Sequence, residues 1–125
     1  MTPLAWAALV AAGAIGAVAR FLLDRAVGER THGVFPRGTL AINVSGSFLL
    51  GLITGLALHH GLGKTPKIVL GTGFCGAFTT FSTFTYETAR LTEEGDLTEA
   101  LGNVALTLLL CAGAAALGLA LPAVF

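Results

Sequence analysis

The sequence predicts an all-α integral membrane protein of four transmembrane helices, the third of which is broken near its middle. The 125 residues are 54% hydrophobic and only 11% charged, whereas a soluble domain carries roughly 25% charged residues. Four apolar segments, each close to the ~20 residues that cross a bilayer, alternate with short polar connections. Glycine and hydroxyl residues interrupt the third segment between Gly71 and Tyr86.

These segments fill nearly the whole chain, so we expect one domain, residues 1–125, without a soluble catalytic part. The connections between them are short, so consecutive helices should pack antiparallel. Small residues at helix contacts let membrane helices approach closely, and glycines in the first, second and fourth segments suit that role. The expected spans are residues 3–27, 37–60, 66–90 and 98–121.

The first span lacks a charged start and exceeds the about 7–15 apolar residues of a signal-peptide core, so we interpret it as retained in the membrane. Arg20 is the one cation placed to reach inward from a span. It could snorkel to the interface, pair with Asp24, or attract anions at the mouth of a pore. The sequence leaves these interpretations open.

The second span begins after Pro36 and contains G-T-L-A-I-N-V-S-G-S-F at Gly38–Phe48. Asn43 in this stretch offers two donors and an acceptor inside the membrane. Its carboxamide could join two helices by hydrogen bonds, or it could donate to a dehydrated anion. Both interpretations stay open at this stage.

The third span opens near Pro66 and reads G-T-G-F-C-G-A-F-T-T-F-S-T-F-T-Y from Gly71 to Tyr86. Glycines followed by hydroxyl residues predict a break in the helix. Broken backbone survives at membrane depth only when protein buries it or when it lines a polar cavity. Its free carbonyls are of the kind that hold alkali cations in transporters. Phe81 and Phe84 share one side of the helix, and their positive ring edges could face a small anion.

The fourth span has Thr107 as its only mid-span hydroxyl, so the sequence leaves open whether a polar track runs along it. Asn103, early in this span, favours a role as an interhelical hydrogen-bonding residue. Gly113 and Gly118 suit close helix contacts.

The Lys and Arg residues give only a weak signal for orientation. The positive-inside rule uses their bias between the two sides of the membrane. The chain therefore inserts one way on a narrow margin or inserts both ways, and dual insertion would permit an antiparallel homodimer. One side has Lys64 and Lys67, and the other has Arg25, Arg30, Arg37 and Arg90.

Several function classes do not fit this chain. A formal net charge of zero argues against nucleic acid as a partner, since duplex binding depends on Lys and Arg. Hydroxyl groups at membrane depth have no base beside them, so they make poor nucleophiles. Cys75 and Cys111 lie in apolar stretches without a metal-ligand spacing. We therefore expect that the protein is not an enzyme.

The motifs Gly38–Phe48 and G-F-C-G-A-F-T-T-F-S-T-F at Gly73–Phe84 together resemble those of the Fluc (CrcB) family of fluoride channels. The resemblance extends over the whole chain in length and four-span layout. It implies an antiparallel dual-topology homodimer with two fluoride pores, in a prokaryotic inner membrane. It also implies a structural sodium ion (Na+) at the dimer centre, held by the backbone carbonyls of Gly76 and Thr79. The expected partners are fluoride, sodium, membrane lipid and a second copy of the chain.

The resemblance implies roles for individual side chains as well. Phe81 and Phe84 would line the pores, and Asn43 would hydrogen-bond fluoride. Arg20, in G-A-V-A-R, would lie in the vestibule. The other polar residues of the pore or the break would be Thr80, Ser82, Thr83 and Thr39.

The function that this implies is passive, selective export of fluoride, which would lower its cytoplasmic concentration. The alternative is a small dual-topology four-helix multidrug or cation exporter. Such an exporter needs a central carboxylate in its first span, where Asp24 is the first acid. Glu87 is the one acid of the third span that could serve, and we expect it near a vestibule or paired with Arg90. A purely structural subunit, with hydroxyls joining helices, is a third possibility.

Overall fold

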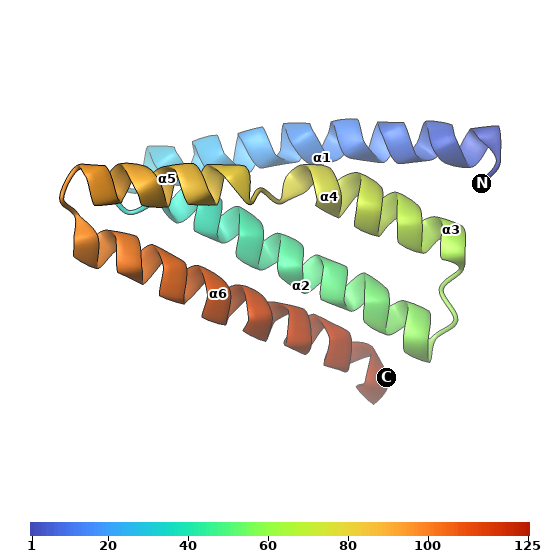
Figure 1. Ribbon diagram of the computed structural model, residues 1–125. Coiled ribbons are helices and arrows are strands. Elements are labelled where there is room, and N and C mark those ends of the chain that lie inside the picture. The colour runs from blue at the N-terminus through green and yellow to red at the C-terminus, as the bar shows by residue number, and fades with distance from the viewer.

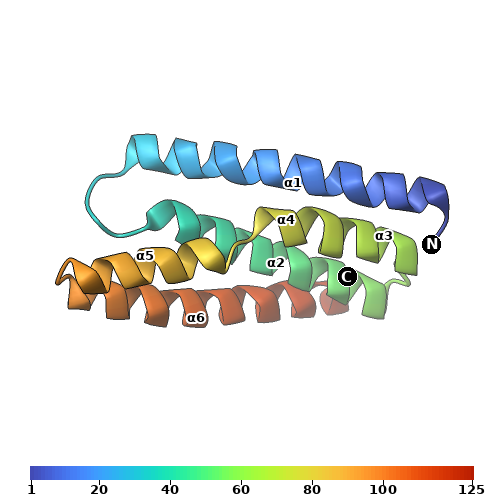
Figure 2. The ribbon, with the colours of Figure 1, turned by 45° about the horizontal axis from the view of Figure 1, so that its top comes forward.

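The computed structural model describes residues 1–125 and contains only helices and their connections, which confirms the all-α class. Four segments are long and apolar enough to cross a membrane: Pro3–Arg30, Arg37–His59, Lys64–Glu93 and Leu97–Val124. They lie side by side with both termini at the same end (Figures 1 and 2). The elements are α1 (Pro3–Arg30), α2 (Arg37–His59), α3 (Lys64–Lys67), η1 (Ile68–Cys75), α4 (Gly76–Phe78), α5 (Ser82–Glu93), α6 (Leu97–Ala120) and η2 (Leu121–Val124).

The first helix, α1, continues beyond residue 27, where we expected the span to end, and stops after Arg30. Thr2 caps its first turn, because Thr2 Oγ1 accepts a hydrogen bond from the Ala5 N–H at 3.1 Å. Near the other end, Arg25 and Glu29 form an ion pair of 3.0 Å. Such a pair, four residues apart, supports a helix, so the polar link begins later than the hydropathy suggested.

The third span consists of two half-helices separated by a break, as the sequence predicts. The first half comprises α3, the π-helical η1 and α4, and the second half is α5. Between them Thr79 is extended, with φ −76° and ψ 159°. The first half packs mainly against α1, while α5 packs against α6. The break therefore lets one span change neighbours midway (Figure 2).

The central helix is α2, which packs against α1, α6 and both halves of the third span. Its most extensive contact is with α6, where glycines take the place of larger side chains. A Cβ on Gly118 would overlap the Phe48 carbonyl, and one on Gly51 would overlap the Ala115 carbonyl. Close approach at small residues is how helices associate in lipid. The broken span packs on this α2–α6 pair, since α2 contacts both of its halves and α6 contacts α5.

Candidate functional site

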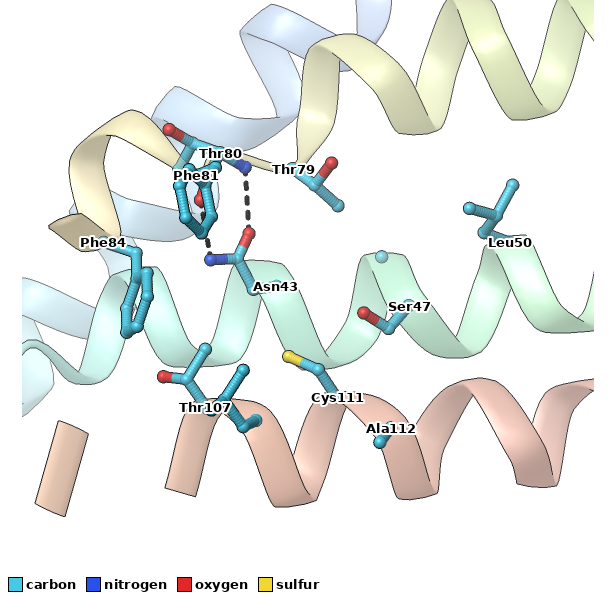
Figure 3. A pocket seen from close by; sticks show the side chains of 12 residues that line it. Asn43, Ser47, Leu50, Thr79, Thr80, Phe81, Phe84, Thr107, Cys111 and Ala112 are labelled. Carbon is cyan, nitrogen blue, oxygen red and sulfur yellow. Dashed lines mark hydrogen bonds between the residues drawn. The ribbon is translucent and has the colours of Figure 1, made fainter. Parts of the chain in front are cut away.

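The break is held to α2 by the carboxamide of Asn43. Asn43 Nδ2 donates to the Thr80 carbonyl at 2.8 Å, and Asn43 Oδ1 accepts from the Thr80 N–H at 2.9 Å. Both residues are buried, and Figure 3 draws their two hydrogen bonds as dashed lines. This is the helix-joining role that one interpretation of Asn43 gave. Nδ2 carries a second N–H, which has no acceptor in the protein and is left for another partner.

The side chain of Thr80 starts the second half-helix. Thr80 Oγ1 accepts a hydrogen bond from the Thr83 N–H at 3.1 Å, and it donates to Thr83 Oγ1 at 2.9 Å. A hydroxyl that accepts from the N–H three residues later is the usual bond of a helix N-cap. The helix can therefore resume directly after the break.

These bonds leave two backbone carbonyls without their usual donors. In a continuous α-helix the Gly76 carbonyl would accept from the Thr80 N–H. The Thr79 carbonyl would likewise accept from the Thr83 N–H. Asn43 Oδ1 takes the first of these N–H groups, and Thr80 Oγ1 takes the second. Both carbonyls are thereby free to accept from, or coordinate, another group.

Arg20 lies beside the break rather than in a polar pair of its own helix. Its Nη1 is 3.5 Å from the Thr79 carbonyl oxygen, which is the outer limit of a hydrogen bond. Arg20 forms no ion pair with Asp24, because the only ion pair of α1 joins Arg25 to Glu29. The guanidinium therefore places a positive charge next to the Thr79 carbonyl.

A groove of about 440 Å³ opens between α2, the break and α6 (Figure 3). Its lining combines an amide, hydroxyls, a thiol and apolar groups, and none of the lining side chains is charged. The lining residues are Asn43, Gly46, Ser47, Leu50, Thr79, Thr80, Phe81, Phe84, Thr107, Leu108, Cys111 and Ala112. A largely apolar groove with a few uncharged polar groups at membrane depth suits a small ion that must shed water.

The two phenylalanines of the groove differ in their surroundings. Their ring centroids are 5.8 Å apart, with the ring planes tilted by 51°. Phe84 is 7% exposed and is held by its own chain, whereas Phe81 is 75% exposed. Phe84 is thus a fixed wall of the groove, and Phe81 projects from the break.

The structure brings only some of the predicted pore residues together. Those in the groove are Asn43, Thr80, Phe81 and Phe84, and those outside its lining are Thr39, Ser82 and Thr83. The Thr39 hydroxyl donates to the Glu87 carboxylate instead. We expected Arg90 as a partner of Glu87, but Arg90 Nε instead lies 3.9 Å from Glu94 Oε1. Thr39 and Glu87 therefore form a separate polar contact between α2 and α5.

Three groove residues that carry a hydroxyl or thiol group were not among the predicted site residues. They are Ser47, Thr107 and Cys111. Ser47 follows Asn43 by four residues, and Cys111 follows Thr107 by four. Residues four apart share one helix face, so this spacing is the sequence signal that finds them. The fourth helix contributes one hydroxyl and one thiol to the groove, from Thr107 and Cys111.

Asn103 joins α5 to α6, as the sequence predicts. It is 1% exposed, and its Nδ2 donates to Thr88 Oγ1 at 2.9 Å. Its Oδ1 accepts from the Thr107 hydroxyl at 3.4 Å. The buried carboxamide therefore also orients Thr107 at the edge of the groove.

The chain matches one protein family over most of its length. Residues 7–119 match the family model described as CrcB-like protein, Camphor Resistance (CrcB). The fluoride-specific ion channel FluC 1 of Leifsonia xyli subsp. xyli (strain CTCB07) is 50% identical over 119 residues, which cover 95% of this chain and 87% of that protein. FluC 1 of Frankia casuarinae is 48% identical over 124 residues, covering 93% and 94% of the two chains. FluC 2 of Mycobacterium bovis is 44% identical over 118 residues, covering 94% and 90%.

Proposed function

The chain belongs to the CrcB family, and from that premise we propose that it is a fluoride-selective channel that passively exports fluoride across the membrane. Its relatives are named fluoride-specific ion channels. The observation that carries the proposal is the groove at the helix break, where polar groups without charge line the membrane interior. Fluoride that enters the cell as HF would ionise in the cytoplasm and accumulate, so an open pathway lowers its concentration.

The groove supplies partners that replace the water of a small anion. Asn43 has a free N–H that Thr80 holds in one orientation. The hydroxyl of Ser47 adds a donor from α2. Phe81 and Phe84 add ring edges, which carry partial positive charge. A neutral set of this kind lets fluoride bind without trapping it, as conduction requires.

Passive conduction fits a groove lining that contains no carboxylate and no charged side chain. A proton-coupled exporter would need an intramembrane carboxylate in its pathway. Glu87 is the acid closest to that description, but its carboxylate accepts from Thr39 outside the groove. The alternative of a multidrug or cation exporter is therefore disfavoured.

We further propose two pores in an antiparallel homodimer of opposite insertions, in a bacterial inner membrane. The groove opens on one side of the chain, and Phe81 is 75% exposed beside it. In the proposed dimer a second copy of the chain, rather than lipid, covers this ring and closes the open side of the groove. The weak Lys and Arg bias between the two sides is compatible with both insertions.

A structural sodium ion at the dimer centre fits the residues present. The carbonyls of Gly76 and Thr79 have lost their helical donors, and Gly76 is exposed. Hard cations prefer such oxygen ligands, and carbonyl groups coordinate monovalent ions in channels. When bound, sodium would supply a positive charge that joins carbonyls from two chains.

The proposal is tested by fluoride efflux from liposomes that contain only the purified protein. Fluoride should leave along its gradient once a counter-ion pathway is opened, while chloride stays inside. Equal rates for the two anions would contradict selectivity. An absence of fluoride flux from protein that is folded would reject the channel in favour of a structural subunit.

A thiol reagent should block the pathway at Cys111. Cys111 lines the groove, whereas Cys75 is 2% exposed and lies outside it. We expect benzyl methanethiosulfonate to form a mixed disulfide with Cys111 and cut fluoride flux at least about tenfold, an increase in barrier of ~1.4 kcal/mol. Flux through Cys111→Ala should resist the reagent, and flux through Cys75→Ala should not. If the reagent blocks Cys111→Ala as strongly as it blocks the original protein, the pathway does not pass Cys111.

A further inference from the structure

The hydrogen bonds of Asn43 take the place of a bond that the third helix has lost. In a continuous helix the Thr80 N–H would belong to the Gly76 carbonyl. Here the Thr80 N–H donates to Asn43 Oδ1 at 2.9 Å, and Asn43 Nδ2 donates back to the Thr80 carbonyl at 2.8 Å. One side chain of α2 thus satisfies both backbone groups of Thr80. The Gly76 carbonyl is left without that donor.

The approach of the break to α2 is itself specified by the sequence. Gly46 lies three residues after Asn43, and a Cβ there would overlap the methyl group of Thr79. The absence of a side chain at position 46 therefore lets Thr79 and Thr80 lie against α2. Asn43 is then within reach of the Thr80 backbone on the same side of the helix.

We propose that Asn43 is a positioning residue for the central cation site, in addition to facing the fluoride groove. By occupying the Thr80 N–H it keeps the Gly76 carbonyl available to the cation. This inference rests on the sodium site proposed above. The Asn43 carboxamide would then serve both ion sites. Its Oδ1 keeps the Gly76 carbonyl available to the cation, and its free N–H faces the fluoride groove.

The same bonds predict what happens when the carboxamide is removed. Without the Asn43 acceptor, the Thr80 N–H is buried and unpaired, which is costly in a membrane. The nearest remedy is the Gly76 carbonyl, its ordinary helical partner. The carbonyl would then turn inward to the helix, and sodium would bind more weakly.

The experiment measures sodium binding rather than flux. The melting temperature of the purified dimer is followed as sodium replaces N-methylglucamine at constant ionic strength, because a ligand that binds only the folded state raises that temperature. We expect the sodium concentration at half-maximal stabilisation to rise at least about tenfold in Asn43→Ala, a loss of ~1.4 kcal/mol in binding. Asn43→Asp retains an acceptor for Thr80, so its midpoint should equal or fall below that of the original protein.

Two further variants guard the interpretation. Thr107→Ala removes another groove hydroxyl that does not contact the break, so its sodium midpoint should stay unchanged. Asn43→Ser is the substitute if the alanine variant does not elute as a dimer. Its hydroxyl is too short to replace the carboxamide fully, so its sodium midpoint should also be raised.

A midpoint in Asn43→Ala equal to that of the original protein would overturn the inference, as would an equal rise in Asn43→Asp. If the protein conducts fluoride but its melting temperature does not change with sodium concentration, both this inference and the proposed sodium site are overturned. That last result would leave the proposed fluoride channel intact, so the two failures are distinguishable.

Discussion

Replacing Phe81 with isoleucine is expected to cut fluoride flux at least about tenfold, or ~1.4 kcal/mol in barrier, while lowering the melting temperature less than Phe84→Ile does. The aromatic edge carries partial positive charge, which the aliphatic side chain of isoleucine lacks. Phe81 is 75% exposed within its own chain, so its replacement removes little internal packing. Flux is measured in liposomes at matched protein density, and stability is measured by thermal unfolding.

Phe84→Ile should reduce flux to a similar degree, but it should also lower stability. Phe84 is 7% exposed, so a smaller side chain leaves a partly filled space in the protein. Phe74→Ile is the matched control, since Phe74 stacks on Phe78 at 5.5 Å in the other half of the third span and does not line the groove. Wild-type flux in both Phe81→Ile and Phe84→Ile would eliminate ring edges as fluoride partners.

The four spans and the break could be predicted from the sequence, because the membrane restricts what a chain can do. Lipid offers no hydrogen bonds to the backbone, so long apolar segments must be helical. For the same reason, Thr79 and Thr80 after a run of glycines could be interpreted as a break. These features depend on residues that are close together in the chain.

The groups that satisfy the break could not be predicted in the same way. Asn43 and Thr80 are 37 positions apart, and their pairing depends on how α2 and the third span are rotated about their axes. Thr39 shows the same limit. It precedes Asn43 by four residues and shares its helix face, yet its hydroxyl donates to Glu87 outside the groove. Two residues on one helix face point in the same direction, but the sequence does not say which neighbouring segment each of them meets.

The fourth helix shows a related limit for packing glycines. Gly113 and Gly118 looked equivalent in the sequence as small residues at helix contacts. In the structure a Cβ on Gly118 would overlap backbone atoms of α2, whereas one on Gly113 would meet nothing within 4 Å. Hydropathy and residue size do not specify how α6 is rotated about its axis, and this rotation decides which glycine faces α2.

Gly118→Val is therefore expected to disrupt the fold, while Gly113→Val is tolerated. At position 118 the added atoms would collide with the Phe48 carbonyl and the Leu52 N–H, and these backbone groups cannot move aside as a flexible side chain can. Overpacking typically costs ~1–3 kcal/mol and occasionally more, and we expect about 3 kcal/mol or more here because α2 and α6 must separate. A loss of this size is a large part of the ~5–15 kcal/mol that stabilises a typical protein.

The pair is compared by thermal unfolding and by the yield of folded dimer in detergent. Gly113→Val should change the free energy of unfolding by no more than about 0.5 kcal/mol, as is usual for sites away from the core. Both variants add the same side chain to the same helix, so helix propensity and hydrophobicity cancel between them. If Gly118→Val unfolds at the same temperature as Gly113→Val, then α2 and α6 do not cross at Gly118, and the groove that their crossing supports would have to be built differently.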